Sequence, residues 1–224
     1  MGYGFKLKLF GDYACFTRPE FKVERVSYDV ITPSAARGII EAIYWKPSIR
    51  WVVDRIHVFN EIKFTNIRRN EVSDKIAVGN IKKIIKNPNA DGNTLFCDVS
   101  ENRQQRAALL LKDVCYLIEF HFEITEKAGD EETEQKHYNI ALRRMREGQC
   151  FYQPYFGTRE FPANFELIEN DECPKGFYSY TDEIDLGWML WDIDFSNNMS
   201  PVFYRAKMKK GIIDVKACRN EVKL

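Results

Sequence analysis

The sequence predicts an α+β fold in which an antiparallel β-sheet carries two helices on one face. Several segments alternate apolar and polar residues, which is the period of a half-buried strand, and two others carry the signals of helix ends. The length of 224 residues predicts one large domain, or one domain with an appendage. Lys and Arg number 33, as do Asp and Glu, so the formal net charge is +0. Nucleic-acid binding would therefore need a local basic patch.

The chain begins with a predicted strand and a predicted helix. Residues 5–9 alternate large apolar side chains with lysines, and Gly11 is expected to end this strand. A helix is predicted over residues 32–46, with Thr32 at its N-cap and Pro33 at its first helical position. The proline directly after this segment is expected to stop the helix.

The middle of the chain predicts a β-rich region with one inserted helix. The elements expected from apolar spacing are strands over residues 49–58 and 61–67, a helix over 70–86, a turn over 87–93 and a strand over 114–125. The last of these has the most regular alternation, with an aromatic or aliphatic residue at every second position. Residues 106–111 precede it across Lys112 and Asp113, which predicts a hairpin.

A second major helix is predicted over residues 131–147. Glutamates stand at its start and arginines at its end, an order that complements the helix dipole, and Gly148 suits the position after its last residue. The shorter β elements expected beyond it are a strand over residues 152–155, a hairpin of 188–195 with 202–208, and a last strand over 212–217.

The order of these elements predicts a ferredoxin-like (RRM-like) βαββαβ domain with insertions, followed by a small C-terminal antiparallel β appendage. The boundary is expected near residue 160, which gives domains of residues 1–160 and 161–224. No apolar run approaches the roughly 18 residues of a membrane span, and the six cysteines are scattered without a CxxC pair. We therefore expect a cytoplasmic protein with reduced thiols, no metal site, no cofactor and no membrane partner.

Two segments suggest chemistry on a nucleic acid. Lys136 and His137 place a permanent cation beside a side chain that titrates near neutrality, a pair suited to phosphodiester cleavage. A solvated helical turn would explain the same pair. Tyr44 to Lys46 could stack a base and hold a phosphate, but packing of the two aromatic residues on the sheet is the simpler explanation.

Other residues could support or replace that chemistry. Arg37 and Arg144 each lie seven residues from one of these candidates and can share its helix face, and Arg159 could contact phosphate or stand in a plain surface turn. Asp192 and Asp194 could hold a divalent ion for a metal-dependent nuclease, but strand alternation alone would place both aspartates in water.

Five short motifs, in register along the chain, carry a family resemblance. They are Leu9–Tyr13, Ile43–Pro47, Leu111–Val114, Lys136–Tyr138 and Phe156–Glu160. Together they resemble the type I-C CRISPR-associated endoribonuclease, the catalytic "d" variant of the fifth Cas family in the RAMP superfamily.

The resemblance implies a function and a site. Members of this family cut CRISPR precursor RNA within the repeat, at the base of its stem-loop and without a metal ion. They then stay bound to the 5′ handle of the crRNA beside the other type I-C Cascade subunits. The catalytic Tyr and Lys-His pair of the family match Tyr44, Lys136 and His137. The RNA-binding residues expected around them are Arg37, Lys46, Arg144 and Arg159.

The implied reaction is attack by the 2′-hydroxyl of RNA on the adjacent phosphate, which leaves a 2′,3′-cyclic phosphate. The sequence leaves the roles of base and acid open between Tyr44 and His137, and we favour His137 for proton transfer and Tyr44 for positioning. Two alternatives also stay open: a non-catalytic scaffold subunit that binds crRNA, and a metal-dependent nuclease that uses Asp192 and Asp194. DNA as a further partner is left open as well.

Overall fold

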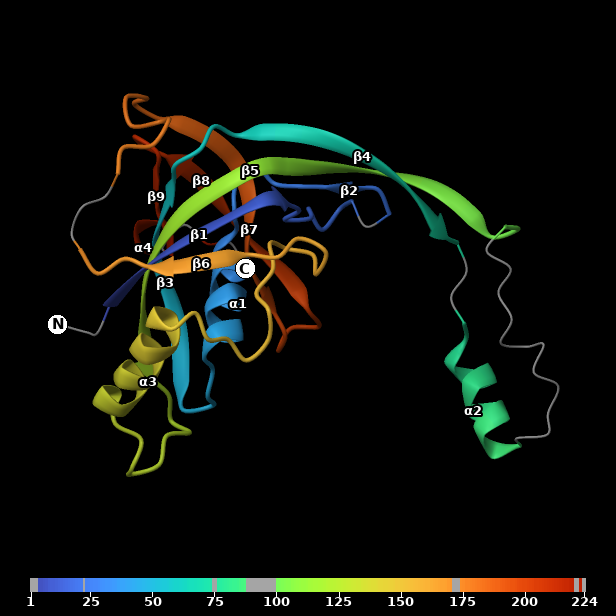
Figure 1. Ribbon diagram of the computed structural model, residues 1–224, viewed down its shortest axis with the longest axis horizontal. Helices are drawn as coiled ribbons and strands as arrows, with labels where there is room; N and C mark the ends of the chain where they lie inside the picture. The colour runs from blue at the N-terminus through green and yellow to red at the C-terminus, as the bar shows by residue number, and fades with distance from the viewer. Residues whose placement is uncertain are drawn as a thin grey trace. The chain divides into compact units, whose positions relative to one another are not determined.

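A computed structural model describes residues 4–21, 23–73, 76–87, 100–170, 174–219 and 222 (Figure 1). The chain divides into two compact units, of which the larger comprises Met1–Thr65 and Leu109–Leu224 and the smaller Asn66–Ala108. The described fold is α+β, as predicted. The predicted turn over residues 87–93 lies, beyond Asn87, outside the described residues, as do Cys97 and Cys173. The domain boundary expected near residue 160 stays a prediction.

A seven-stranded sheet forms the centre of the fold. Its main path runs in the order β6-β1-β5-β3-β9, and β2 and β4 pair with β5 outside this path. The strands are β1 (Gly4–Ala14), β2 (Arg25–Val26), β3 (Ile49–Val58), β4 (Lys63–Val72), β5 (Arg103–Ile124), β6 (Asn164–Leu167) and β9 (Ile212–Asp214). Because β5 pairs antiparallel with both β1 and β3, it is the central strand of the larger unit.

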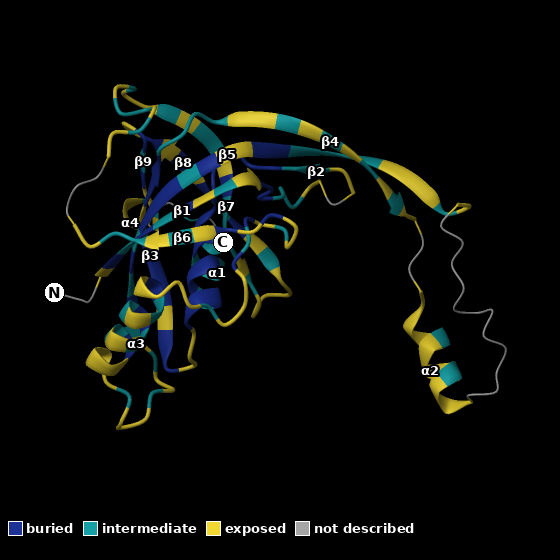
Figure 2. Ribbon diagram, in the orientation of Figure 1, coloured by how far each residue is buried: buried dark blue, intermediate teal, exposed yellow. Residues whose placement is uncertain are grey.

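The alternation predicted for residues 114–125 is confirmed in β5. Tyr116, Ile118, Phe120 and Phe122 are all buried, and in Figure 2 the larger unit's part of β5 is mostly buried. Ile118 faces Leu7 of β1 on one side and a β3 isoleucine on the other. These side chains form the core on which the helices pack.

Helix α1 (Pro33–Ile43) begins where the sequence predicts. The Thr32 side chain accepts a hydrogen bond from the Ala35 N–H, and Pro33 occupies the first turn. The helix ends three residues earlier than expected, because Tyr44 already has an extended backbone with φ −152° and ψ 123°. The proline at position 47 disfavours helical geometry at the residue before it, which is consistent with this early end.

Helix α3 (Glu134–Arg146) also confirms its prediction, with a later start. Thr133 is the N-cap, and its side chain accepts from the Lys136 N–H. Gly148 follows the helix with a positive φ of 64°, as its predicted position requires. Glu131 and Glu132, which the sequence placed in the first turn, precede the helix instead.

Four other predictions about single elements are wrong. Gly11 does not end β1, since it pairs with Val114 and the pairing continues beyond it. The Phe156 ring lies so close that a Cβ at this position would have little room.

The hairpin predicted at Lys112 and Asp113 does not form, because β5 continues through both residues and Asp113 only adopts a local φ of 53°. Residues 70–72 belong to β4, so the predicted inserted helix shortens to α2 (Val78–Lys86), which has no buried residue.

The fourth correction concerns residues 152–155, which form no strand in the structure. Tyr155 makes only an isolated bridge with Pro162, and the strand that pairs with the outer side of β1 is β6. The predicted C-terminal hairpin is confirmed as β7 (Ile184–Asp194) and β8 (Ser200–Met208). The last predicted strand divides into β9 and a short helix, α4 (Val215–Cys218). None of the helices in the described part of the chain has the length and apolar character that a membrane crossing needs.

We expect Gly157→Ala to destabilise the fold by about 3 kcal/mol or more, because it combines a strained backbone with a clash. Gly157 has φ +81°, and an added Cβ would lie 1.9 Å from the carbonyl oxygen of Cys15. Gly148→Ala is the matched control, since Gly148 has φ +64° with nothing within 4 Å and should cost about 1 kcal/mol. Urea unfolding measures both free energies, and equal losses would contradict this account of Gly157.

Candidate active site

Tyr44 directly follows the end of α1, His137 lies in the first turn of α3, and their side chains meet. The Tyr44 hydroxyl lies 2.8 Å from Nδ1 of His137, although the two residues are 93 positions apart in the chain. The extended backbone of Tyr44 is held by Trp51, whose indole N–H donates to the Tyr44 carbonyl at 2.7 Å. The sequence placed these two side chains on different elements, and the fold brings them into direct contact.

The other ring nitrogen of His137 is held by a carboxylate and a hydroxyl. Nε2 lies 2.9 Å from Oε2 of Glu132 and 3.3 Å from Oγ of Ser48. Ser48 also donates a short hydrogen bond to the same Oε2. Because an ionised carboxylate can only accept, a neutral His137 carries its proton on Nε2, and Nδ1 is then an acceptor for the Tyr44 hydroxyl.

Lys136 joins the same group of side chains through Glu132. Its Nζ lies 3.4 Å from Oε1, the second oxygen of the Glu132 carboxylate. The Lys136 side chain is 46% exposed, whereas Tyr44 is 3% and His137 1% exposed. Of the three predicted catalytic residues, Lys136 is therefore the one that an RNA phosphate at the surface would meet first.

Charge and burial set the protonation of this group. Burial raises the pKa of the Tyr44 hydroxyl, the negative charge of Glu132 raises it further, and Arg144 lowers it. The hydrogen bond from Ser48, followed by contacts with Lys136 and His137, lowers the pKa of Glu132. At neutral pH the phenol is consequently protonated and the carboxylate ionised, which matches the direction of the hydrogen bonds.

Arg144 supports Tyr44 from α3. Its guanidinium donates to the Ile43 carbonyl at 2.7 Å and lies over the Tyr44 ring, 5.4 Å from the ring centroid. The first contact satisfies a carbonyl at the end of α1 that has no partner within the helix. Arg144, predicted to bind RNA, thus makes contacts that hold Tyr44 in place.

The other predicted RNA-binding residues lie apart from this group or at the surface. Arg37 donates through two guanidinium nitrogens to both oxygens of Asp192, and one of these contacts measures 2.9 Å. Lys46 and Arg159 are exposed. Trp45 is 54% exposed, so only Tyr44 of that aromatic pair packs in the interior.

The two aspartates considered for a metal site have separate local roles. Asp192 pairs with Arg37, while Asp194 accepts hydrogen bonds from Ser196 and from the Asn197 backbone in the β7–β8 turn. A shift in register after Leu190 overrides the expected alternation and brings Asp192 to Arg37. No group of three or more His, Cys, Asp or Glu side chains in the described residues could hold a metal ion.

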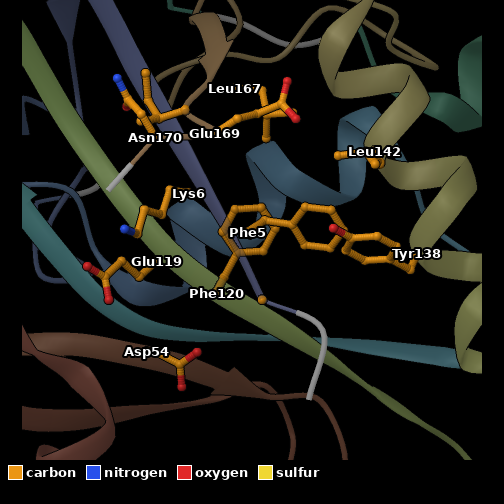
Figure 3. Close-up of a pocket in the computed structure, with 12 residues that line it drawn as sticks. Phe5, Lys6, Asp54, Glu119, Phe120, Tyr138, Leu142, Leu167, Glu169 and Asn170 are labelled. Atoms are coloured by element: carbon orange, nitrogen blue, oxygen red, sulfur yellow. The ribbon is translucent and has the colours of Figure 1, made fainter. Parts of the chain in front are cut away.

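A separate pocket of about 410 Å³ is lined by residues of β1, β5 and α3, including Phe5, Phe120 and Tyr138 (Figure 3). Tyr138, the residue after His137, stacks there on Phe5 with the ring centroids 5.0 Å apart. The acidic residues Asp54, Glu119 and Glu169 also line it, each paired with a histidine or arginine. Its lining includes none of Tyr44, Lys136 and His137.

Ser48 and Glu132 are the site residues that sequence reasoning missed. Glu132 stands four residues before Lys136, a spacing that suggests contact within one helix, but it lies ahead of the helix N-cap. Its contact with His137 depends on how the chain enters α3, which the spacing does not encode. Ser48 carries no comparable signal.

Comparisons with known proteins agree with the resemblance. Residues 4–216 match the family model Cas5d, described as CRISPR-associated protein (Cas5). The protein of Mannheimia succiniciproducens named CRISPR pre-crRNA endoribonuclease Cas5d is 52% identical over 212 residues, which cover 94% of this chain and 93% of that protein. The Thermus thermophilus protein of the same name is 38% identical over 231 residues, covering 95% of this chain and 91% of that protein.

A solved structure has the same fold. A crystal structure described as a CRISPR-associated protein superposes with a TM-score of 0.70 at 26% identity, covering all of this chain and 97% of that one. The family model spans nearly the whole chain, and both named relatives exceed 30% identity over most of it. The chain therefore belongs to the Cas5d family of CRISPR-associated proteins.

Proposed function

We propose that this protein is an endoribonuclease that cuts CRISPR precursor RNA within the repeat, at the base of the stem-loop. The observation that carries the proposal is the hydrogen bond between Tyr44 and His137, with Lys136 beside them at the surface. The names of the two relatives, both pre-crRNA endoribonucleases, support the same activity. The product is expected to stay bound by its 5′ handle beside other type I-C Cascade subunits.

The proposed chemistry needs only side chains of this protein. The 2′-hydroxyl of RNA gives up its proton as its oxygen bonds to the adjacent phosphorus, the bond from phosphorus to the 5′-oxygen breaks, and the leaving oxygen takes up a proton. His137 moves these protons, Tyr44 positions it, and Lys136 stabilises the charge on the phosphate in the transition state. The products are a 2′,3′-cyclic phosphate and a 5′-hydroxyl.

Because Tyr44 and His137 are buried, the site must open before RNA can react there. Both ring nitrogens of His137 have partners, and its side chain is 1% exposed. We therefore expect a bound phosphate to draw Lys136 toward itself and to open the group on that side, since catalytic contacts often form fully only in the substrate complex.

We also propose that the sheet has a ferredoxin-like core. The strand order β6-β1-β5-β3 supports it, with α1 between β1 and β3 and α3 between β5 and β6 in the chain. The antiparallel pairs of β1 with β5, β1 with β6 and β3 with β5 are those that a βαββαβ unit requires. In this arrangement α1 leads into the start of β3 and α3 follows the end of β5. Because Ile49 pairs with Ile124, the end of α1 and the start of α3 lie at the same end of these two strands.

The first experiment tests the reaction itself. Incubation of the protein with its cognate repeat RNA in excess chelator should give one cut at the stem base with a 2′,3′-cyclic phosphate, because no step uses a metal ion. A matched RNA with a single 2′-deoxy nucleotide before the cut should stay intact, since it lacks the nucleophile. Cleavage of that RNA would contradict the proposed chemistry, and RNA that is bound but uncut would indicate a scaffold subunit.

Substitution of His137 tests the site. His137→Ala should lower the single-turnover rate about 1,000-fold, within the usual range for a general acid or base, and leave RNA affinity within a few-fold. His121→Ala is a matched control, since His121 also pairs with a carboxylate, at 2.7 Å, but lies outside the site. Thermal unfolding of each variant shows whether it folds. A folded His137→Ala protein that cuts as fast as wild type would exclude His137 from the reaction.

Tyr44→Phe tests the role of the Tyr44 hydroxyl apart from that of its ring. The ring should still pack in the interior, but Nδ1 of His137 loses its hydrogen-bond partner at 2.8 Å. We expect the cleavage rate to fall about 10-fold to 100-fold with little change in RNA affinity, as for loss of a group that orients a catalytic side chain. A rate loss as large as that of His137→Ala would instead assign proton transfer to Tyr44.

A further inference from the structure

Glu132 contacts two of the proposed catalytic residues at once. One carboxylate oxygen lies 2.9 Å from Nε2 of His137, and the other lies 3.4 Å from Nζ of Lys136. Ser48 donates to the oxygen that faces His137, which limits rotation of the carboxylate. The Glu132 side chain is 27% exposed, so it lies between the buried histidine and the more exposed lysine.

We propose that Glu132 is a positioning residue, which fixes the tautomer and orientation of His137 with one oxygen and the place of Lys136 with the other. The inference rests on the function proposed above and adds a residue to its site. Glu132 need not touch RNA for this role, since it acts through the two residues that do.

The contact with His137 determines which ring nitrogen carries the proton. A carboxylate accepts the Nε2 proton, so the lone pair of the neutral ring is on Nδ1, beside the Tyr44 hydroxyl. Without that acceptor the ring could carry its proton on Nδ1 and present no lone pair to Tyr44. The same logic makes a carboxylate behind a catalytic histidine worth several orders of magnitude in rate in other enzymes.

The contact with Lys136 leaves that ammonium available to the substrate. An ammonium group has three N–H donors, and the contact with Glu132 uses one of them. The others can bind a phosphate while the stem of the side chain stays beside His137. Glu132 thus holds the cation close to the histidine without blocking it.

Glu132→Gln is the decisive variant, because glutamine keeps the size but offers one acceptor to two donors. If its oxygen faces His137, its NH₂ group points at the Lys136 ammonium. If its NH₂ group faces His137, it donates to Nε2 and moves the ring proton to Nδ1. Either arrangement disrupts one of the two contacts. Glu132→Asp keeps the charge on a shorter side chain, and Glu131→Gln removes the same charge from an exposed neighbouring residue.

The kinetic experiment measures single-turnover cleavage and RNA affinity for all four proteins in chelator. We expect Glu132→Gln to lose about 100-fold in rate while its Kd stays equal or becomes tighter, as for loss of a group that orients a catalytic side chain. Glu132→Asp should recover to within about 10-fold of wild type, and Glu131→Gln should match wild type. A Glu132→Gln rate within two-fold of wild type would overturn the proposal.

A spectroscopic experiment tests the tautomer without any cleavage. Imidazole ¹⁵N resonances at alkaline pH report which ring nitrogen carries the proton, and the His137 signals are those missing from a His137→Gln spectrum. Wild type and Glu131→Gln should show the proton on Nε2, and Glu132→Gln should shift toward the Nδ1 form in the fraction of molecules whose NH₂ group faces His137. A wild-type His137 ring that carries its proton on Nδ1 would overturn the proposal.

The two experiments separate this inference from the proposed function. If the wild-type protein cuts its RNA and Glu132→Gln does not slow it, the function holds and the role of Glu132 is lost. If the wild-type protein binds RNA without cutting it, the proposed function fails, and the catalytic role of Glu132 fails with it. The ¹⁵N comparison would then still show whether Glu132 sets the histidine tautomer.

Discussion

The position of the candidate site depends on the antiparallel pairing of β5 with both β1 and β3. This pairing places the strand that follows α1 and the strand that precedes α3 side by side. The end of one helix and the start of the other must then lie near the same edge of the core. The buried aromatic and aliphatic side chains of β5 fix that arrangement, because a one-residue slip in register would turn them toward solvent.

The candidate site is a hydrogen-bonded chain that is buried at Tyr44 and His137 and partly exposed at Glu132. Glu132, His137 and Tyr44 are joined through both nitrogens of one imidazole ring, and Ser48 and Arg144 hold the two ends. In a low-dielectric interior such a chain is strong when every member has its partner and costly when one is missing. The residues proposed for catalysis therefore also contribute to stability, so loss of activity in their variants has meaning only beside a measurement of folding.

Much of this fold follows from local sequence signals. Thr32, Pro33 and Gly148 define helix ends through chemistry that acts within a few residues, and the alternation of β5 shows which side chains it buries. Two of the wrong predictions concern Gly11 and Asp113, where a local break signal is overridden by pairing between distant strands. Asp192 departs from its expected face for a similar reason, a register shift in a hairpin followed by an ion pair with a helix.

The site was only partly predictable for the same physical reason. Tyr44, Lys136 and His137 could be singled out by residue type and by resemblance, but contact between Tyr44 and His137 depends on tertiary structure. Glu132 and Ser48 have no distinctive local pattern. They become visible only when the entry to α3 and the turn before β3 lie together.

One side of the candidate site is held by the core, through the hydrogen bond from Trp51 to the Tyr44 carbonyl, and the other side faces solvent. Trp51 packs against Phe5, Phe120 and Phe122, so Tyr44 is anchored to an aromatic cluster of the core. The opposite side consists of Lys136 and Glu132, which solvent reaches. Any movement that admits a substrate must then occur on the side of α3, while the end of α1 serves as a fixed reference against which the reacting groups are aligned.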